Sequence, residues 1–151
     1  MPGHRKHDRP LSRAQFEVRF PDDAAGAAYL TARRWPDGFV CPGCGGAKGW
    51  ALMTKAHTWE CAACHRQTSV TAGTILHGSH LPLKVWFTAI RIITSHSNGI
   101  SALQLQAPLG LGSYKSAWLM LQKLRRAMVN PGRSLLEGVV ETFAAGGEAI
   151  A

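Results

Sequence analysis

All four cysteines of the chain fall within one short stretch, where they form two C-x-x-C pairs. Cys41 and Cys44 make the first pair, and Cys61 and Cys64 make the second. A C-x-x-C turn places two thiolates on one side of a tight knuckle. Two knuckles joined by about 15–20 residues can bring four sulfurs into the tetrahedron that zinc prefers. The spacing therefore predicts one structural Zn²⁺, held by Cys41, Cys44, Cys61 and Cys64.

The residues beside the cysteines refine this prediction. Gly43, Gly45 and Gly46 suit the positive φ angles that we expect in a knuckle turn. His65 follows Cys64 directly, but four thiolates already complete the tetrahedron. We therefore expect His65 to lie beside the site or on the surface, and not to bind the metal.

Other uses of the cysteines fit the sequence less well. Disulfides need an oxidising compartment, and the N-terminal M-P-G-H-R-K-H-D-R-P lacks the apolar core of a secretion signal. A thioredoxin-like dithiol needs a single C-x-x-C at a strand–helix junction, and unrelated cysteines seldom fall into a double spacing. No apolar run approaches the roughly 20 residues that span a membrane. These features predict a cytoplasmic protein without a membrane partner.

Positive charge dominates one half of the chain. The 151 residues, enough for one or two small domains, hold 17 Lys+Arg against 9 Asp+Glu, and none of those acids lies between Cys61 and Leu136. That stretch contains a set of basic residues: Arg66, Lys84, Arg91, Lys115, Lys123, Arg125, Arg126 and Arg133. An acid-free basic half indicates a polyanionic partner, most often nucleic acid. The alternative is that the charge only aids solubility.

Local patterns predict an α+β chain: a small β zinc ribbon with rubredoxin-like knuckles, flanked by N-terminal helices and followed by a helical domain. We expect a disordered basic arm over residues 1–11, two helices over 12–36, capped by Ser12 and Asp22, and the zinc ribbon over 37–77. Within the ribbon, residues 50–53, 58–60 and 67–71 are the expected strands. Trp35 is expected to pack over the knuckles.

The helical domain is expected over residues 81–130. A helix over 83–96 is apolar around most of its circumference, with Lys84, Thr88, Arg91 and Ser95 in one narrow arc, which predicts a core helix. A short helix capped by Ser101 is expected to reach about Gln106 and to be ended by Pro108, Gly110 and Gly112. A longer helix, capped by Ser113, then reaches about residue 128. This order is the outline of a helix-turn-helix.

One face of the longer helix gathers polar side chains suited to DNA. Its apolar residues, Met128 among them, gather on one side, and the polar ones on the opposite side can clamp phosphates and reach base edges. We predict that Lys115, Gln122, Lys123 and Arg126 contact DNA, and that Arg125 and Arg133 contact the DNA backbone. An ordinary amphipathic hairpin with solvated lysines is the alternative. Residues 131–151 are expected to form a loose tail.

With these motifs in place, residues 16–140 resemble the front end of an insertion-sequence transposase that opens with a zinc ribbon and continues into a DDE-type catalytic domain. The resemblance rests on R-R-W-P-D-G-F-V-C-P-G-C-G, W-E-C-A-A-C-H-R-Q-T-S-V-T, L-P-L-K-V-W-F, G-I-S-A-L-Q-L and Y-K-S-A-W-L-M-L-Q-K-L-R-R-A-M. It implies that this region recognises double-stranded DNA at the element's terminal repeats, in a bacterial, nucleoid-associated protein. A ribonuclease-H-like domain that cuts and joins DNA would follow.

The chain departs from that family at the start of the expected catalytic domain. The family carries its first metal-binding aspartate in a context like V-D-E-T-aromatic, and this chain reads V-V-E-T-F with Val140 at the aspartate position. Valine offers no oxygen to magnesium, and two-metal strand transfer needs several carboxylates. We therefore expect a truncated, transposase-derived DNA-binding protein with no catalytic residues of its own.

Two alternatives remain open from the sequence. One is an active transposase whose catalytic domain is encoded separately. The other is a zinc-ribbon adaptor whose basic face meets an acidic protein. Besides DNA, we expect two possible partners: a second copy of the chain or a separately encoded transposase.

Overall fold

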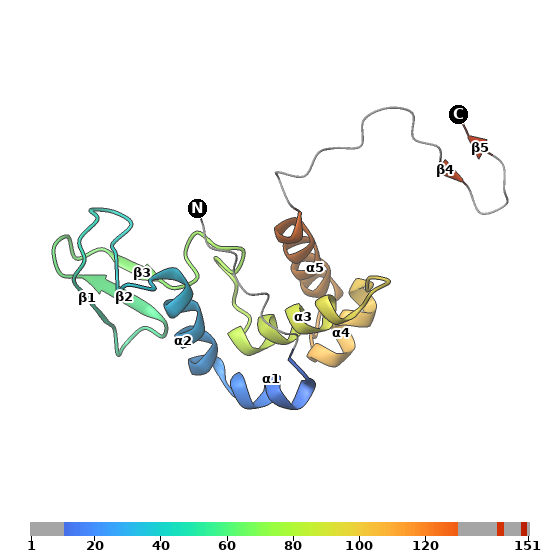
Figure 1. Ribbon diagram of the computed structural model, residues 1–151, viewed down its shortest axis with the longest axis horizontal. Coiled ribbons are helices and arrows are strands. Elements are labelled where there is room, and N and C mark those ends of the chain that lie inside the picture. Colours follow the sequence, from blue (N-terminus) through green and yellow to red (C-terminus); the bar gives the residue numbers. More distant parts are fainter. Residues whose placement is uncertain (1–10, 130–141, 144–148, 151) are drawn as a thin grey trace.

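The computed structural model describes residues 11–129, 142–143 and 149–150, and joins a cluster of helices to a small antiparallel sheet (Figure 1). The helices are α1 (Arg13–Arg19), α2 (Asp23–Arg34), α3 (Leu83–Ser95), α4 (Ala102–Leu109) and α5 (Tyr114–Met128). The sheet contains β1 (Gly49–Ala51), β2 (Thr58–Cys61) and β3 (Gln67–Ser69). This mixture of helices and a small ribbon agrees with the predicted α+β class.

The sheet has the order β1–β2–β3, and both pairs of neighbours are antiparallel. Trp50, Glu60 and Gln67 lie opposite one another across the three strands and therefore share one face. The other face is buried in a small core formed by Trp35, Phe39, Cys41, Cys61 and Val70, with Trp59 packed against it. The predicted packing role of Trp35 is confirmed, since only 8% of the residue is exposed.

A second, larger core lies among the helices. It contains residues of all five helices, including Phe16 and Phe20 next to the buried side of α3. The Phe20 and Phe87 rings stack with their centroids 4.7 Å apart. Six of the thirteen residues of α3 are buried, which confirms its prediction as the central core helix. The N-terminal helices therefore pack with the helical part of the chain and extend its core.

Helix α2 links the two cores. Leu30 packs against both of them. At the end of the helix, the Arg34 guanidinium donates hydrogen bonds to the carbonyl oxygens of Val70, at 3.1 Å, and Ala72. The same guanidinium lies 5.2 Å from the centre of the Trp35 ring. Helix α2 is thus bonded to the segment that leaves the ribbon.

The starts of the first two helices and of α4 agree with the sequence. Ser12 and Gln15 form a reciprocal capping box on α1, and the Asp22 carboxylate accepts a hydrogen bond from the amide of Ala25. Ser101 and Gln104 form a second capping box on α4. Short polar side chains compete well for the unpaired amides at helix starts, which is why these boundaries were predictable.

Several expected boundaries were wrong. Helix α4 does not end at about Gln106 but includes Pro108 and continues to Leu109, where Gly110, one of the expected glycines, closes the last turn in a left-handed conformation. Ser113 occupies the N-cap position of α5 without a capping hydrogen bond from its side chain. β1 ends at Ala51 and β3 at Ser69, two residues earlier than predicted in each case. Met128, expected on the packed side of α5, is 54% exposed.

Some of the predictions made from the sequence concern residues outside the described ranges. This applies to residues 1–10 of the predicted basic arm, to Arg133 and to Val140. In the predicted tail, Thr142–Phe143 (β4) pairs with Ala149–Ile150 (β5) in an antiparallel manner. Among the described helices, none has the length and apolar character that crossing a membrane requires.

The start of α3 is capped by a residue of another helix. Its N-cap is Pro82, whose side chain offers no acceptor, and the Asp23 carboxylate of α2 accepts the Lys84 amide at 2.9 Å instead. The Lys84 ammonium donates to the carbonyl oxygen of Pro21 at 2.7 Å. One carboxylate therefore satisfies an amide at the start of α3 and fixes its position against α2.

Replacing Asp23 by Ala should lower the free energy of unfolding of the helical part by about 1 kcal/mol, the usual cost of a lost N-cap. Urea unfolding followed by helical circular dichroism, with zinc present throughout, measures this loss. Asp37→Asn removes an exposed carboxylate outside the helices and serves as the control. Equal stability of the Asp23 variant and the control would contradict this capping role.

Candidate metal centre

The two C-x-x-C knuckles have the same backbone geometry. In the first, the Cys41 amide donates to the Gly46 carbonyl at 2.9 Å, and the Gly45 amide donates to the Cys41 carbonyl at 2.9 Å. In the second, the corresponding bonds run from Cys61 to Arg66, at 3.1 Å, and from His65 to Cys61, at 3.0 Å. The amide two residues after the first cysteine of each pair also points at its sulfur, at 3.4 Å in both knuckles.

This shared geometry corrects the prediction for the glycines. Of Gly43, Gly45 and Gly46, only Gly45 has a positive φ, of +73°. The equivalent position of the second knuckle is His65, which adopts φ +57° without being a glycine. Gly46 lies where space is tight, since a Cβ there would be 3.3 Å from two cysteine sulfurs. One position per knuckle needs the left-handed backbone, and only one of the two carries a glycine.

The four sulfurs come together in a cluster of the size that zinc needs. All four lie within 4.8 Å of one another, and the Cys41–Cys64 and Cys44–Cys61 pairs are each 3.6 Å apart. A tetrahedral ion with Zn–S bonds of about 2.3 Å needs sulfurs about 3.8 Å apart. A disulfide would need about 2.05 Å, so the separations fit metal ligands and exclude disulfides. The predicted ligand set is the one that the fold assembles.

Each knuckle contributes one buried and one exposed cysteine. Cys41 and Cys61 are 2% and 0% exposed and belong to the ribbon core, whereas Cys44 and Cys64 face the outside. A zinc ion bound here would cross-link the two knuckles, and four thiolates would leave it no position for water or substrate. The centre is therefore built for a structural ion.

Hydrogen bonds and neighbouring thiols shift the pKa values of these cysteines in opposite directions. Backbone amides, chiefly that of Cys44, lower the pKa of Cys41 to about 6. Amides of the second knuckle, chiefly that of Cys64, lower the pKa of Cys61. For Cys64 the Arg66 amide acts in the same direction, but hydrogen bonding to Cys44, burial and the other two thiols outweigh it and raise the pKa to about 12. Four thiolates this close together need a cation to ionise fully.

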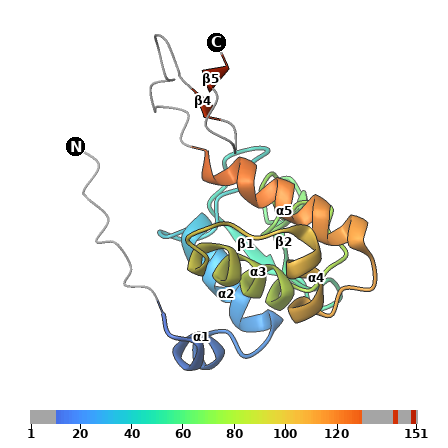
Figure 2. The same cartoon turned by 90° about the vertical axis from the view of Figure 1, so that its right-hand side faces the viewer.

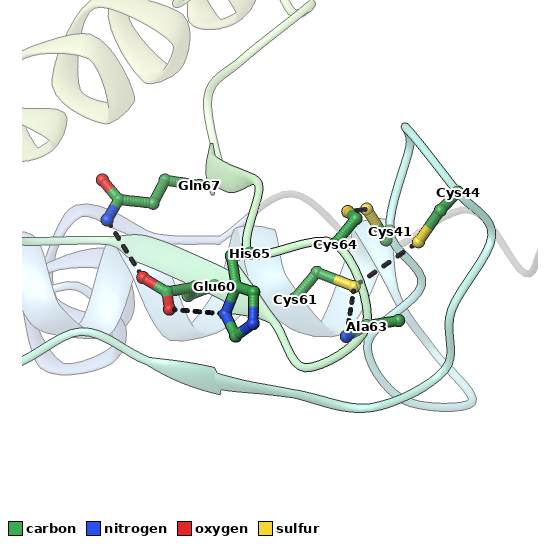
Figure 3. A network of polar contacts seen from close by, with 8 residues as sticks. All are labelled: Cys41, Cys44, Glu60, Cys61, Ala63, Cys64, His65 and Gln67. Carbon is green, nitrogen blue, oxygen red and sulfur yellow. Dashed lines mark hydrogen bonds and ion pairs between the residues drawn. The ribbon is translucent and has the colours of Figure 1, made fainter.

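His65 belongs to a polar network on the sheet face and not to the ligand set (Figure 3). Its Nδ1 lies 3.5 Å from a Glu60 carboxylate oxygen. The other oxygen of Glu60 accepts a hydrogen bond from the Gln67 amide at 3.0 Å, and Gln67 in turn accepts one from Lys55 at 2.7 Å. As expected from the sequence, His65 lies beside the centre without entering it.

The residues predicted to contact DNA do not share one environment. Lys115, Gln122 and Arg126 are exposed on α5 and, within the described part of the chain, make no hydrogen bond or ion pair through their side chains. Lys123 instead reaches the His77 carbonyl at 3.4 Å and lies 5.9 Å from the centre of the Trp86 ring. The sequence placed these side chains on one helical surface but could not show which ones the neighbouring segments engage.

Arg125 is also engaged by the protein itself. Its guanidinium donates a hydrogen bond of 2.8 Å to the carbonyl oxygen of Ile100, in the loop before α4. The fold therefore separates the predicted set into three side chains free on the surface and two, Lys123 and Arg125, tied to other segments. Arg133 lies outside the described residues.

Cys61→Ser should reduce the bound zinc from one ion per chain to none, because a three-thiolate site in a buried core holds the ion far less tightly. Structural zinc sites contribute about 10–16 kcal/mol of binding free energy, so the ribbon should unfold with it. Metal analysis measures the first effect, and tryptophan fluorescence, to which Trp35 and Trp59 of the ribbon core contribute, measures the second. His65→Ala is the control and should retain one zinc. Loss of zinc from the His65 variant would assign His65 to the ligand set.

Zinc affinity should fall as the pH is lowered. At neutral pH the Cys41 thiol, with its pKa lowered to about 6, is largely ionised already, whereas Cys64, with its pKa raised to about 12, carries a proton that zinc must displace. Zinc-dependent stability is therefore present at higher pH and lost as protons compete for the sulfurs. Calorimetric titration in two buffers of different ionisation enthalpy should show proton release; a binding constant independent of pH would contradict it.

Comparisons with known proteins agree with this centre. Residues 21–67 match the family model of the transposase zinc-ribbon domain, of the IS1595 type. An uncharacterised protein in transposable element ISH50 of Halobacterium salinarum is 29% identical over 124 residues, which are 81% of this chain and 41% of that protein. The chain thus spans less than half the length of this relative. No solved structure matches the chain. The ribbon around Cys41, Cys44, Cys61 and Cys64 is accordingly similar to the zinc ribbon of transposases.

Proposed function

We propose that this chain is a transposase-derived protein that binds double-stranded DNA at the ends of an insertion element. The observation that carries the proposal is the exposed surface of α5, where Lys115, Gln122 and Arg126 lie without a partner within the described residues. No acidic residue occurs between Cys61 and Leu136 to neutralise it. The matched transposase zinc ribbon and the relative from a transposable element support the same partner.

The arrangement of α4 and α5 suits a helix that enters the major groove. Helix α5 buries Ala117, Met120, Leu121 and Leu124 and turns the opposite side outward. Its 15 residues extend about 22 Å at 1.5 Å per residue, enough to follow a groove across several base pairs. Lys115 and Arg126 would bind phosphates or guanine edges, and Gln122 would meet adenine. In this proposal α5 is the recognition helix and α4 its support.

The proposal assigns no chemistry to this region. Within the described part of the chain, one group of three or more His, Cys, Asp or Glu side chains comes close enough to hold a metal, and all of its members are cysteines. DNA strand transfer by two metal ions uses carboxylate ligands. We infer that the ribbon and helices position DNA, and that any cutting would come from a catalytic domain outside the described residues.

A protein partner is the second candidate, because the same helix exposes large apolar side chains. Tyr114 is 54% exposed, and Trp118 and Leu119 are each 45% exposed. An acidic protein could bury these residues against the basic ones. Generic duplex DNA would compete with such a partner only if both use this helix. Binding to a purified acidic partner that is lost when Trp118 and Leu119 are replaced by Ala, and that duplex DNA leaves unchanged, would favour this candidate and contradict DNA binding by α5.

Replacing Lys115, Gln122 and Arg126 together by Ala should weaken binding to duplexes that carry the element's terminal repeats. Because two phosphate-neutralising cations are lost, the slope of log K against log salt should fall by about two. Fluorescence anisotropy at several salt concentrations measures both quantities. Lys55→Gln, a charge removed from the ribbon, is the control. Wild-type affinity that does not change between low and moderate salt would contradict the proposed function.

A further inference from the structure

A second basic surface lies away from α5, in a groove between α1, α3 and α4. The groove encloses about 440 Å³ and is lined by the polar arc of α3, including Lys84, Thr88 and Arg91. Arg13 and Glu17 of α1 form its other wall. The sequence showed this arc as a narrow polar line on a core helix. The fold turns it into the floor of a groove.

Arg91 is the central residue of this groove. Its guanidinium lies 5.7 Å from the centre of the Phe16 ring, and the residue is half-buried. Across the described residues it makes no side-chain hydrogen bond or ion pair. Arg34 and Arg125, by contrast, are satisfied by backbone carbonyls. A partly desolvated guanidinium that is oriented by a ring but lacks an acceptor is prepared for an anion.

A second stacked arginine continues the surface beyond Phe16. Arg91 also lines a neighbouring hollow of about 600 Å³, which it shares with Arg19. The Arg19 guanidinium lies 5.7 Å from the centre of the Phe20 ring and 5.3 Å from that of Tyr29. Two guanidinium groups are thus held against one aromatic cluster. Planar guanidinium groups held in this way lose little freedom when they bind phosphate oxygens.

The charges around the two hollows favour an anion. Among the described residues that line them, Glu17 is the single acid, and Arg13 holds it in an ion pair of 3.0 Å. Arg19, Lys84 and Arg91 therefore remain as net positive charge. Focusing by a concave, partly apolar wall strengthens the attraction of such a site for anions.

This surface and the exposed side of α5 face away from each other. Figures 1 and 2 both place α1 and α5 on opposite sides of α3. Helix α5 packs its apolar side inward, so its free basic residues point away from the core that separates the two. A straight duplex lying on the exposed side of α5 would be on the other side of α3 from α1.

We propose that the groove centred on Arg91 binds the phosphate backbone of a second DNA segment, so that one chain bridges two duplexes. The choice of DNA as the source of phosphate rests on the proposed function, because the α5 surface would hold the first duplex. Arg91 and Arg19 bind phosphate oxygens, and Lys84 adds charge at the edge of the groove. The contacts are with the backbone, and the second segment is bound without regard to its sequence.

The test uses the full chain loaded with zinc. One duplex is fixed to beads and saturated with protein, and capture of a second, labelled duplex is measured over a range of salt. The double variant Arg19→Gln and Arg91→Gln should reduce capture of the second duplex roughly tenfold, as expected for lost charge-assisted hydrogen bonds, with the first duplex still bound. Lys48→Gln, which removes a charge from the ribbon, is the matched control and should bridge normally.

Glu17→Gln is expected to change the capture of the second duplex in the opposite direction. Removing the single acid of the groove should strengthen capture of the second duplex, and a protein that failed to fold could not show this gain. Unchanged capture in both the arginine variant and the Glu17 variant would overturn the proposal. So would displacement of the second duplex from wild type by a polyglutamate peptide that binds the groove more tightly than DNA, since the partner would then be an acidic protein.

The α5 variant separates this proposal from the proposed function. If both hold, the variant with Ala at Lys115, Gln122 and Arg126 binds a single duplex through the groove and does not bridge, and its remaining binding weakens roughly tenfold when Arg19→Gln and Arg91→Gln are added. If the α5 surface binds no DNA, the wild type does not bridge, and Arg19→Gln with Arg91→Gln weakens single-duplex binding by the same factor. Single-duplex binding by the α5 variant that is indifferent to Arg91 would overturn the groove proposal alone.

Discussion

The ribbon depends on four sulfurs sharing one cation. Its three strands hold three or four residues each, and its buried core consists of Trp35, Phe39, Cys41, Cys61 and Val70. Two of those five residues are ligands, so burial alone offers this part of the chain little free energy, and the metal has to supply the rest. The matching backbone hydrogen bonds of the two knuckles bring the sulfurs into range, and a cation removes the repulsion that four thiolates would otherwise feel.

Helix α2 contacts both the ribbon and the other helices and holds them in a fixed arrangement. Its Leu30 packs in both cores, and Arg34 binds the carbonyls of Val70 and Ala72 at the exit of the ribbon. At its other end Asp23 caps α3. The hydrogen bonds of Arg34 and Asp23 are polar and directional, so they fix orientation as well as distance. DNA bound by the helices would therefore meet the ribbon in a fixed relation, which a flexible linker would not provide.

The lack of acids between Cys61 and Leu136 affects how the basic residues of that stretch are held. With few carboxylates available, arginines are oriented by aromatic rings or by backbone carbonyls. Carbonyls satisfy Arg125, whereas rings leave the donors of Arg19 and Arg91 free for an outside anion. The same composition that indicates a polyanionic partner thus explains why two separate surfaces remain unpaired. Because they lie on opposite sides of α3, we propose that the α5 surface binds one duplex and the Arg91 groove binds a second.

Local chemistry let the sequence determine the ligand cysteines, the capped helix starts and the core role of α3, because spacing, capping and periodicity act over a few residues. The sequence could not determine which knuckle position needs a positive φ, since His65 adopts the conformation that a glycine was expected to take. It grouped Lys123 and Arg125 with the free DNA-facing residues, but His77 and Ile100, distant in sequence, engage them. The groove at Arg91 exists because α1 packs across α3. Contacts between distant segments decided these features, and no local pattern encodes them.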